Sequence, residues 1–131
     1  MKNKFISAEE AASMVKDGMT VMIGGFMAVG SPHSIIAKMV EKGVKDLTII
    51  CNDTAFPDKG IGLLIANKQV KRVITSHIGT NPCTIEQFNN KEISIEFNPQ
   101  GTLAERVRCA GAGLGGFLTP TGIGTIVEEG K

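Results

Sequence analysis

Residues 19–32, with the sequence MTVMIGGFMAVGSP, decide how this chain is organised. The apolar and β-branched run at 19–23 predicts a buried strand, which breaks at Gly24 and Gly25. Ser31 and Pro32 then predict a helix start, with serine as the N-cap and proline as the first helical residue. A strand, a glycine loop and a helix in this order make the first part of a βαβ unit.

The same alternation continues along the chain. Further strands are expected at 47–51, 73–76, 93–97 and 124–127, and helices at 8–16, 32–43, 61–66, 84–90 and 102–109. Capping boxes are expected to open the first and last of these helices, with Ser7 and Glu10 in one and Thr102 and Glu105 in the other. The pattern predicts an α/β fold, a mostly parallel open sheet with βαβ crossovers, in one domain over residues 1–131. Because the last strand is followed by only four residues, we expect the sheet to be incomplete at its C-terminus.

Composition excludes several classes of protein. The 131 residues are 42% hydrophobic and 21% charged with a net charge of +1, which argues against disorder and against binding to nucleic acid or an anionic membrane. No stretch approaches the roughly 20 apolar residues that span a bilayer, and the N-terminus lacks the pattern of a signal peptide. Cys51, Cys83 and Cys109 are widely spaced, which predicts free thiols in the cytoplasm and no metal site.

Four loops follow the predicted strands at their carboxyl ends, where open α/β sheets bind ligands. These loops are residues 24–30, 52–54, 76–77 and 98–101. All four are rich in glycine or in hydrogen-bonding side chains. We therefore expect them to share one rim of the sheet and to form the binding site.

The glycine loop at 24–30 lets the backbone approach a ligand closely, and the helix after it offers free amides to a carboxylate or phosphate. A side chain at Gly25 would intrude on such a ligand. Spacing alone supports a tight packing turn equally well, and the loop lacks the Gly-Lys-Ser/Thr of a P-loop. Residues 111–116 satisfy G-x-G-x-x-G, but a helix precedes them where a dinucleotide site needs a strand.

Few side chains suggest catalysis. The Gln100 amide could donate to an oxyanion, or could be an ordinary turn residue. The carboxylate of Glu105 is explained by its capping box, and His77 fits a structural histidine better than a general base. Asp53 and Asp58 are expected to be ordinary turn residues. The residues by themselves indicate loops that hold a ligand without a complete catalytic set.

Five segments, in order, resemble the family I coenzyme A-transferases, most closely the α subunits of the enzymes that act on acetate, butyrate and acetoacetate. They are DGxxVMIGGFxxxGxP at 17–32, NDT at 52–54, SHIG at 76–79, PQGTLAER at 99–106 and a glycine-rich segment at 111–125 that includes FxTPTGxGT. The resemblance covers the whole chain. It implies a fold of the CoA-transferase/NagB-like type, with residues 1–131 forming the N-terminal part of an α-subunit domain, because the usual subunit is longer.

The resemblance also implies a reaction, in which CoA moves between a short-chain acyl-CoA and a free carboxylate by a ping-pong route. The nucleophilic glutamate of the family lies on the β subunit, so this chain supplies no catalytic nucleophile and acts in a hetero-oligomer. Coenzyme A and acyl-CoA are substrates, and no cofactor is expected to be bound permanently.

The resemblance assigns binding roles to two sets of residues. Those expected to bind CoA are Gly24, Gly25, Phe26, Met27, Ala28, Val29 and Gly30. Those expected to bind the acyl substrate are Asn52, Gln100, Gly113, Gly115, Gly116 and Phe117, with Gln100 helping to hold the thioester oxyanion. Two alternatives stay open: a non-catalytic module that binds CoA or another anion, and an inactive fragment of such a subunit.

Overall fold

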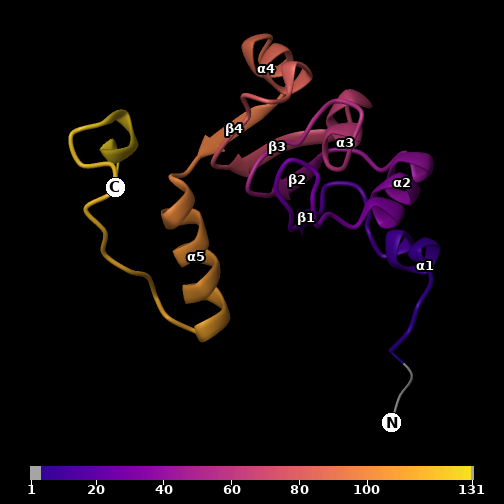
Figure 1. The fold of residues 1–131 in the computed structure, drawn as a ribbon, viewed down its shortest axis with the longest axis horizontal. Coiled ribbons are helices and arrows are strands. Elements are labelled where there is room, and N and C mark those ends of the chain that lie inside the picture. The colour runs from indigo at the N-terminus through magenta and orange to yellow at the C-terminus, as the bar shows by residue number, and fades with distance from the viewer. Residues whose placement is uncertain (1–3, 131) are drawn as a thin grey trace.

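The computed structural model describes residues 4–130 (Figure 1). Four strands alternate with helices, and a longer helix follows the last strand. The elements in chain order are α1 (Ala8–Ser13), β1 (Thr20–Met22), α2 (His33–Lys42), β2 (Leu47–Ile50), α3 (Gly62–Ala66), β3 (Val70–Thr75), α4 (Pro82–Asn89), β4 (Ser94–Phe97), α5 (Gln100–Ala112) and the 3₁₀ helix η1 (Ile126–Glu128). None of the helices in this described part is long and apolar enough to cross a membrane.

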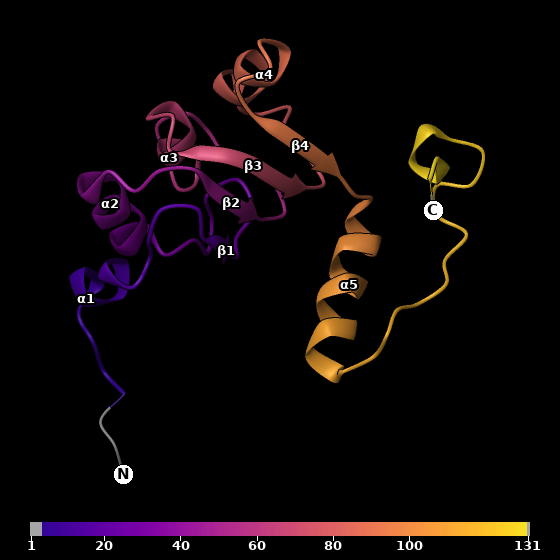
Figure 2. The same ribbon diagram turned by 180° about the vertical axis from the view of Figure 1, so that it is seen from behind.

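The four strands form one parallel sheet in the order β1-β2-β3-β4, which confirms the α/β prediction. Because crossovers between parallel strands are right-handed in almost all proteins, this strand order is expected to place α2, α3 and α4 on one face of the sheet. Consistent with this, α2 contacts α3, α3 contacts α4, and α1 packs beside α2. The arrows of β3 and β4 point toward α5 in Figure 2, and because all neighbouring strands are parallel, the carboxyl ends of the sheet face this helix.

The core lies between that helical layer and the sheet. One residue from each strand, Val21, Ile49, Val73 and Ile95, forms a row in register across the sheet and belongs to the core cluster or packs against it. Ile36, Met39, Leu64 and Ile65 of α2 and α3 cover this row and are 0–1% exposed. These buried helical residues explain why strands with few residues hold their register.

The strand predicted at 19–23 is buried only in part. Its three strand residues, Thr20–Met22, form β1 at the edge of the sheet, where Val21 packs against the core as a partly buried side chain. Ile23, directly after β1, is buried in the core. Met22 points to the other face and is 55% exposed. An edge strand can be as apolar as a buried strand even when one of its faces is exposed. Composition alone therefore predicted too much burial for this strand.

Helix caps agree with the sequence in part. The capping box of Ser7 and Glu10 is confirmed, and Gly43 ends α2 in the left-handed conformation with φ of 69°. Ser31 is not the N-cap of α2. That position belongs to Pro32, and the Ser31 hydroxyl donates instead to the Gly24 carbonyl, 3.2 Å away. The Ser31 side chain therefore closes the glycine loop.

The C-terminal third differs most from the prediction. Helix α5 begins at Gln100 without a capping box, because Glu105 pairs with Arg108 and the buried Thr102 hydroxyl makes no hydrogen bond. The helix continues to Ala112, so Gly113 is its C-cap. The strand expected at 124–127 is absent from the described residues, where the 3₁₀ helix η1 takes its place.

In the middle of the chain, strand β3 begins at Val70, three residues before the predicted start at 73.

Candidate functional site

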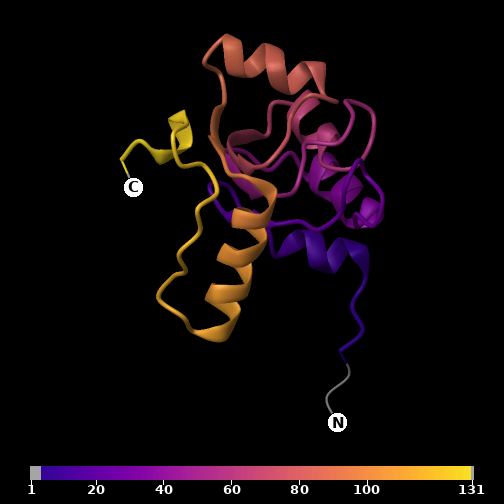
Figure 3. The same cartoon turned by 60° about the vertical axis from the view of Figure 1, so that its left-hand side comes forward.

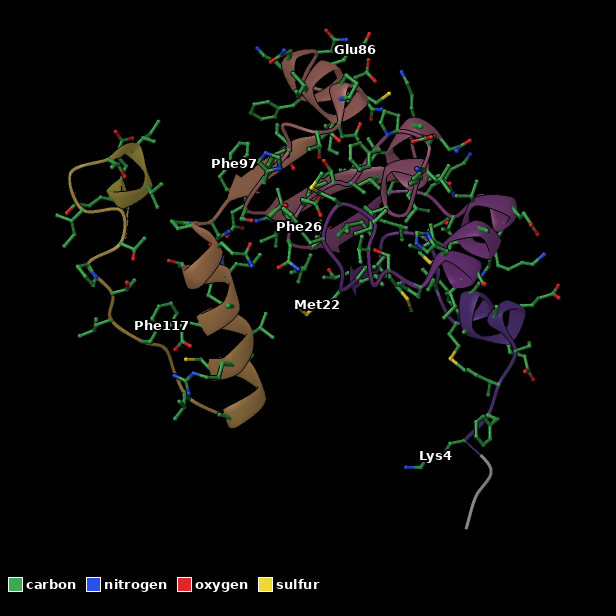
Figure 4. All side chains as sticks on the ribbon, in the orientation of Figure 1. Lys4, Met22, Phe26, Glu86, Phe97 and Phe117 are labelled. Carbon is green, nitrogen blue, oxygen red and sulfur yellow. The ribbon has the colours of Figure 1, made fainter. Side chains whose placement is uncertain are left out.

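The predicted rim exists at the carboxyl ends of the strands. A hollow of about 550 Å³ is lined there by Phe26, Asn52, Ser76, His77 and Gln100. These residues come from the loops after β1, β2 and β3 and from the start of α5. Four segments that are distant in sequence therefore meet in one place. Phe26 is labelled at this edge of the sheet in Figure 4.

A continuous series of hydrogen bonds connects these segments. The Gln100 side-chain nitrogen, Nε2, donates to Asn52 Oδ1 at 2.8 Å. Asn52 Nδ2 donates to the Gly25 carbonyl, also at 2.8 Å, and Ser76 Oγ donates to Gln100 Oε1 at 2.5 Å. The two amides predicted to bind substrate, Asn52 and Gln100, therefore contact each other and are connected to the glycine loop.

Asp53 is not an ordinary turn residue, contrary to the prediction. Its side chain is buried, with 2% exposed, and both carboxylate oxygens accept a hydrogen bond from the Met27 backbone nitrogen at 3.1 Å. One of them also accepts from the Ala55 nitrogen at 3.0 Å. Charge-assisted bonds of this kind are about twice as strong as neutral ones. Asp53 therefore fixes the glycine loop against the end of β2.

The glycine loop needs this support because its backbone is strained. Met27 and Ala28 have φ of 50° and 69°, in the left-handed region that side chains other than glycine rarely adopt. Phe26 and Val29 close the loop with reciprocal backbone hydrogen bonds of 3.0 and 2.9 Å. The position of Asp53, shortly after a buried strand, was the available signal for such a role. Residue type alone favoured a turn.

The seven residues predicted to bind CoA do not share one environment. Ala28 is buried, with 6% exposed, whereas Val29 is 77% exposed and Phe26 is 54% exposed. Ala28 lies against Gly60, where an added β-carbon would approach within 3.2 Å of the Ala28 Cβ. Ala28 therefore anchors the loop, and the exposed members of the set face outward.

The second predicted set is divided by the structure. Asn52 and Gln100 lie at the rim, whereas Gly115, Gly116 and Phe117 line a separate hollow with Arg106 and Cys109. The segment after α5 runs back along the outer side of that helix (Figure 3). Phe26 and Phe117 lie on opposite sides of α5 (Figure 4). Within this chain, residues 113–117 do not reach the rim.

The hollow has no carboxylate or thiol among its five lining residues. Its one hydroxyl, that of Ser76, donates to Gln100 Oε1. The nearby Cys51 is 2% exposed, and burial raises the pKa of its thiol to about 12, so it stays protonated at neutral pH. Glu105 is held by Arg108, whose hydrogen bonds lower the pKa of the glutamate. The lining therefore offers amide and hydroxyl groups for hydrogen bonds, and it includes neither a carboxylate nor a thiol that could act as a nucleophile.

A parallel sheet with amide donors at its carboxyl edge defines the class: an open α/β protein, a fold in which ligands commonly bind at the strand ends. The chain belongs to the coenzyme A transferase family, because the family described as Coenzyme A transferase matches it over residues 5–131.

Curated relatives agree. The chain is 56% identical to "Acetate CoA-transferase subunit alpha" of Escherichia coli K12, covering 100% of this chain and 60% of that protein. It is 53% identical to "Acetoacetyl-CoA:acetate/butyrate CoA transferase alpha subunit" of Clostridium acetobutylicum, with the same coverage of both chains. The chain therefore spans about three-fifths of the length of these two relatives.

A solved structure supports the fold. An acyl-CoA transferase from Escherichia coli O157:H7, crystallised as a thioester complex with CoA, matches with a TM-score of 0.79 and 26% identity. The match covers 93% of this chain and 25% of that one. The arrangement of strands and helices described above is thus shared with a CoA transferase.

Proposed function

We propose that this chain is the α-subunit part of a heteromeric CoA-transferase that moves CoA between a short-chain acyl-CoA and a free carboxylate such as acetate, acetoacetate or butyrate. The single observation that carries the proposal is the rim itself. It brings Asn52 and Gln100 together beside the glycine loop and has no carboxylate among its lining residues. The names of the relatives, which are α subunits, supply the substrate class and imply a β partner.

The chemistry divides between two chains. A glutamate carboxylate of the β subunit attacks the thioester carbonyl, so a carbon–oxygen bond forms, the carbon–sulfur bond breaks and the CoA thiolate leaves. The thiolate then attacks the glutamyl carbonyl of the anhydride, which releases the first carboxylate and leaves CoA on the glutamate. The second acid reverses both steps. Covalent catalysis replaces one difficult exchange by two easier ones.

This chain contributes electrostatic stabilisation and binding. In each attack the carbonyl oxygen acquires negative charge, which the amide of Gln100 stabilises by donating a hydrogen bond. The glycine loop, residues 24–30, binds the CoA part of the substrate. The assignment of residues 113–117 to the acyl pocket stays a prediction, since this loop lies away from the rim in this chain.

Reconstitution with a β subunit tests the proposal. The chain is mixed with its β subunit, and the formation of acetyl-CoA from butyryl-CoA and acetate is followed by chromatography. We expect turnover with both chains and none with either alone. After incubation with acyl-CoA, borohydride reduction should modify a glutamate of the β subunit only.

Two results would contradict the proposal. Turnover by this chain alone, or a trapped glutamate on it, would show that the nucleophile is not supplied by a partner. CoA binding without turnover in the mixture would favour the non-catalytic module instead. Isothermal titration of the chain with CoA distinguishes that module from an inactive fragment, which would bind nothing.

A further inference from the structure

We infer that Ser76 is a positioning residue that fixes the amide of Gln100, and that the Gly25 carbonyl sets the direction of the hydrogen bonds between them. The inference rests on the proposed function, in which Gln100 is the oxyanion donor. The sequence predicts only that Ser76 lies in a loop at the end of a strand. The hydrogen bonds around it indicate a role in positioning Gln100.

The direction of the contacts follows from a single group. A backbone carbonyl can only accept hydrogen bonds, so the Asn52 atom that lies 2.8 Å from the Gly25 oxygen must be the amide nitrogen. The Asn52 oxygen therefore faces Gln100, and the atom of Gln100 beside it must be the nitrogen. The Gln100 oxygen is left facing Ser76, whose hydroxyl has to donate. No other orientation of the two amides satisfies all three contacts.

The Ser76 hydroxyl has two acceptors within reach but only one proton. Besides Gln100 Oε1, the carbonyl of Asn52 lies 2.7 Å from Ser76 Oγ. That carbonyl already accepts from the Ser76 backbone nitrogen at 3.1 Å and from the Thr75 hydroxyl at 2.9 Å, which fill its two lone pairs. The other acceptor near the Thr75 hydroxyl, the His77 carbonyl, is more distant at 3.4 Å. The proton is therefore available for Gln100. The backbone of Ser76 is held in place by the same carbonyl.

This arrangement leaves donors for a ligand. Among residues 4–130, Gln100 Nε2 makes only the bond to Asn52, and Asn52 Nδ2 makes only the bond to Gly25. Each nitrogen carries two hydrogens, so each keeps one for another partner. A carbonyl or carboxylate oxygen can satisfy them, whereas a group that only donates cannot. If the side-chain amide of Gln100 were flipped by 180°, its oxygen would face the ligand and would repel the negative charge that develops there.

The first arm of the test observes the Gln100 amide directly. The sequence contains three glutamines, at 69, 87 and 100, so glutamine-selective ¹⁵N labelling gives three side-chain signals, and Gln100→Ala assigns one of them. We expect Ser76→Ala to shift the Gln100 signal and Ser76→Thr, which keeps the hydroxyl, to restore it. Ser94→Ala is the matched control, because Ser94 also donates to a backbone carbonyl, that of Lys71 on the neighbouring strand. It should leave the signal unchanged.

The second arm measures turnover of the reconstituted complex with the β subunit. Gln100→Ala should lower kcat by about 10²–10³, the usual effect of losing one oxyanion donor. Ser76→Ala should lower kcat by about tenfold, as expected for one hydrogen bond, with little change in KM. In the Gln100→Ala background, Ser76→Ala should have almost no further effect, because residues that act as a unit are not additive.

The outcomes separate the inference from the proposed function. An unchanged Gln100 signal in Ser76→Ala, or a loss of kcat that simply multiplies with that of Gln100→Ala, would overturn the role of Ser76. Full turnover of Gln100→Ala, in contrast, would overturn the proposed role of Gln100 itself. Failure of Ser76→Thr to recover turnover while Ser94→Ala is normal would also count against the inference.

Discussion

Two adjacent glycines in the loop after β1 play different parts. Gly25 has φ of 117°, and a β-carbon there would lie 2.4 Å from the Ser31 hydroxyl oxygen and 2.9 Å from the Val29 carbonyl oxygen. Gly24 would meet nothing within 4 Å. The sequence suggests that a side chain at Gly25 would block a ligand. The structure shows that it would first collide with the loop itself.

We therefore predict that Gly25→Ala lowers the free energy of unfolding by about 1–3 kcal/mol, from backbone strain and from the displaced Ser31. Gly24→Ala is the control and should change stability by less than about 0.5 kcal/mol. Urea unfolding followed by circular dichroism measures both. Equal effects of the two variants would show that the loop tolerates a side chain at either position.

At this scale the sequence predicts some site residues well and others poorly. Gln100 and Asn52 could be predicted because each follows a strand, and the ends of parallel strands meet at one edge. The buried carboxylate of Asp53 could not, because its role depends on the backbone nitrogen of Met27, 26 residues away in sequence. Contacts between loops of this kind leave no local pattern in the chain.

Among the elements, β3, β4 and α5 are tied together by one carboxylate. Glu96 on β4 contacts Arg106 of α5 and Arg72 of β3, each at 2.6 Å. The Arg106 hydrogen bond is the main reason that the pKa of Glu96 is lowered to about 2, and Arg72 and Asn98 add to it. Since no strand within residues 4–130 pairs with β4 on its outer side, these ion pairs hold the edge of the sheet to the middle of α5.

This ion-pair group predicts a pH dependence. Because the pKa of Glu96 is lower in the folded chain than its usual 4.5, ionised Glu96 stabilises the fold above about pH 4.5. That contribution is lost as the pH falls toward 2. We expect it to be about 1 kcal/mol, since the Glu96 side chain is 34% exposed and solvent screens the pairs.

The measurement is the free energy of unfolding between pH 7 and pH 2. Glu96→Gln should flatten the part of the curve below pH 4.5, whereas Glu129→Gln should not. The Glu129 side chain makes no ion pair with any residue between 4 and 130. A curve for Glu96→Gln that is parallel to that of the unchanged protein would contradict the prediction.

Whole elements were easier to predict than their ends. Strands β2 and β4 and helix α3 fall within a residue or two of the expected ranges, because apolar runs bounded by turn residues mark them clearly. The errors occur where a polar side chain has a competing partner. Ser31 donates to Gly24 instead of capping α2, and Glu105 pairs with Arg108 instead of completing a capping box. Local propensity cannot rank such competing hydrogen bonds.

For the molecule as a whole, the sheet has one covered face and one face that is only partly covered. The covered face carries the core row of Val21, Ile49, Val73 and Ile95. On the other face Met22, Ile50 and Ile74 form an apolar row in register that ends at Glu96, with Met22 exposed and the two isoleucines half-buried. Within residues 4–130 only α5 approaches this row, where Leu103 and Val107 form a hollow with Met22. The parallel alternation of strands and helices was predicted from the sequence. The strand order and the face that stays open were not, because they depend on the direction and handedness of the crossovers.

An exposed apolar surface of this kind binds hydrophobic dyes and promotes association. We predict that Met22→Lys reduces the fluorescence of bound anilinonaphthalene sulfonate and the self-association of the 131-residue chain seen in sedimentation velocity. Stability should change little, because Met22 is already 55% exposed. Met14→Lys is the matched control: Met14 is 61% exposed at the end of α1, in the helical layer. If both variants lower dye binding equally, dye binding comes from general hydrophobicity, and the open face of the sheet has no special part in it.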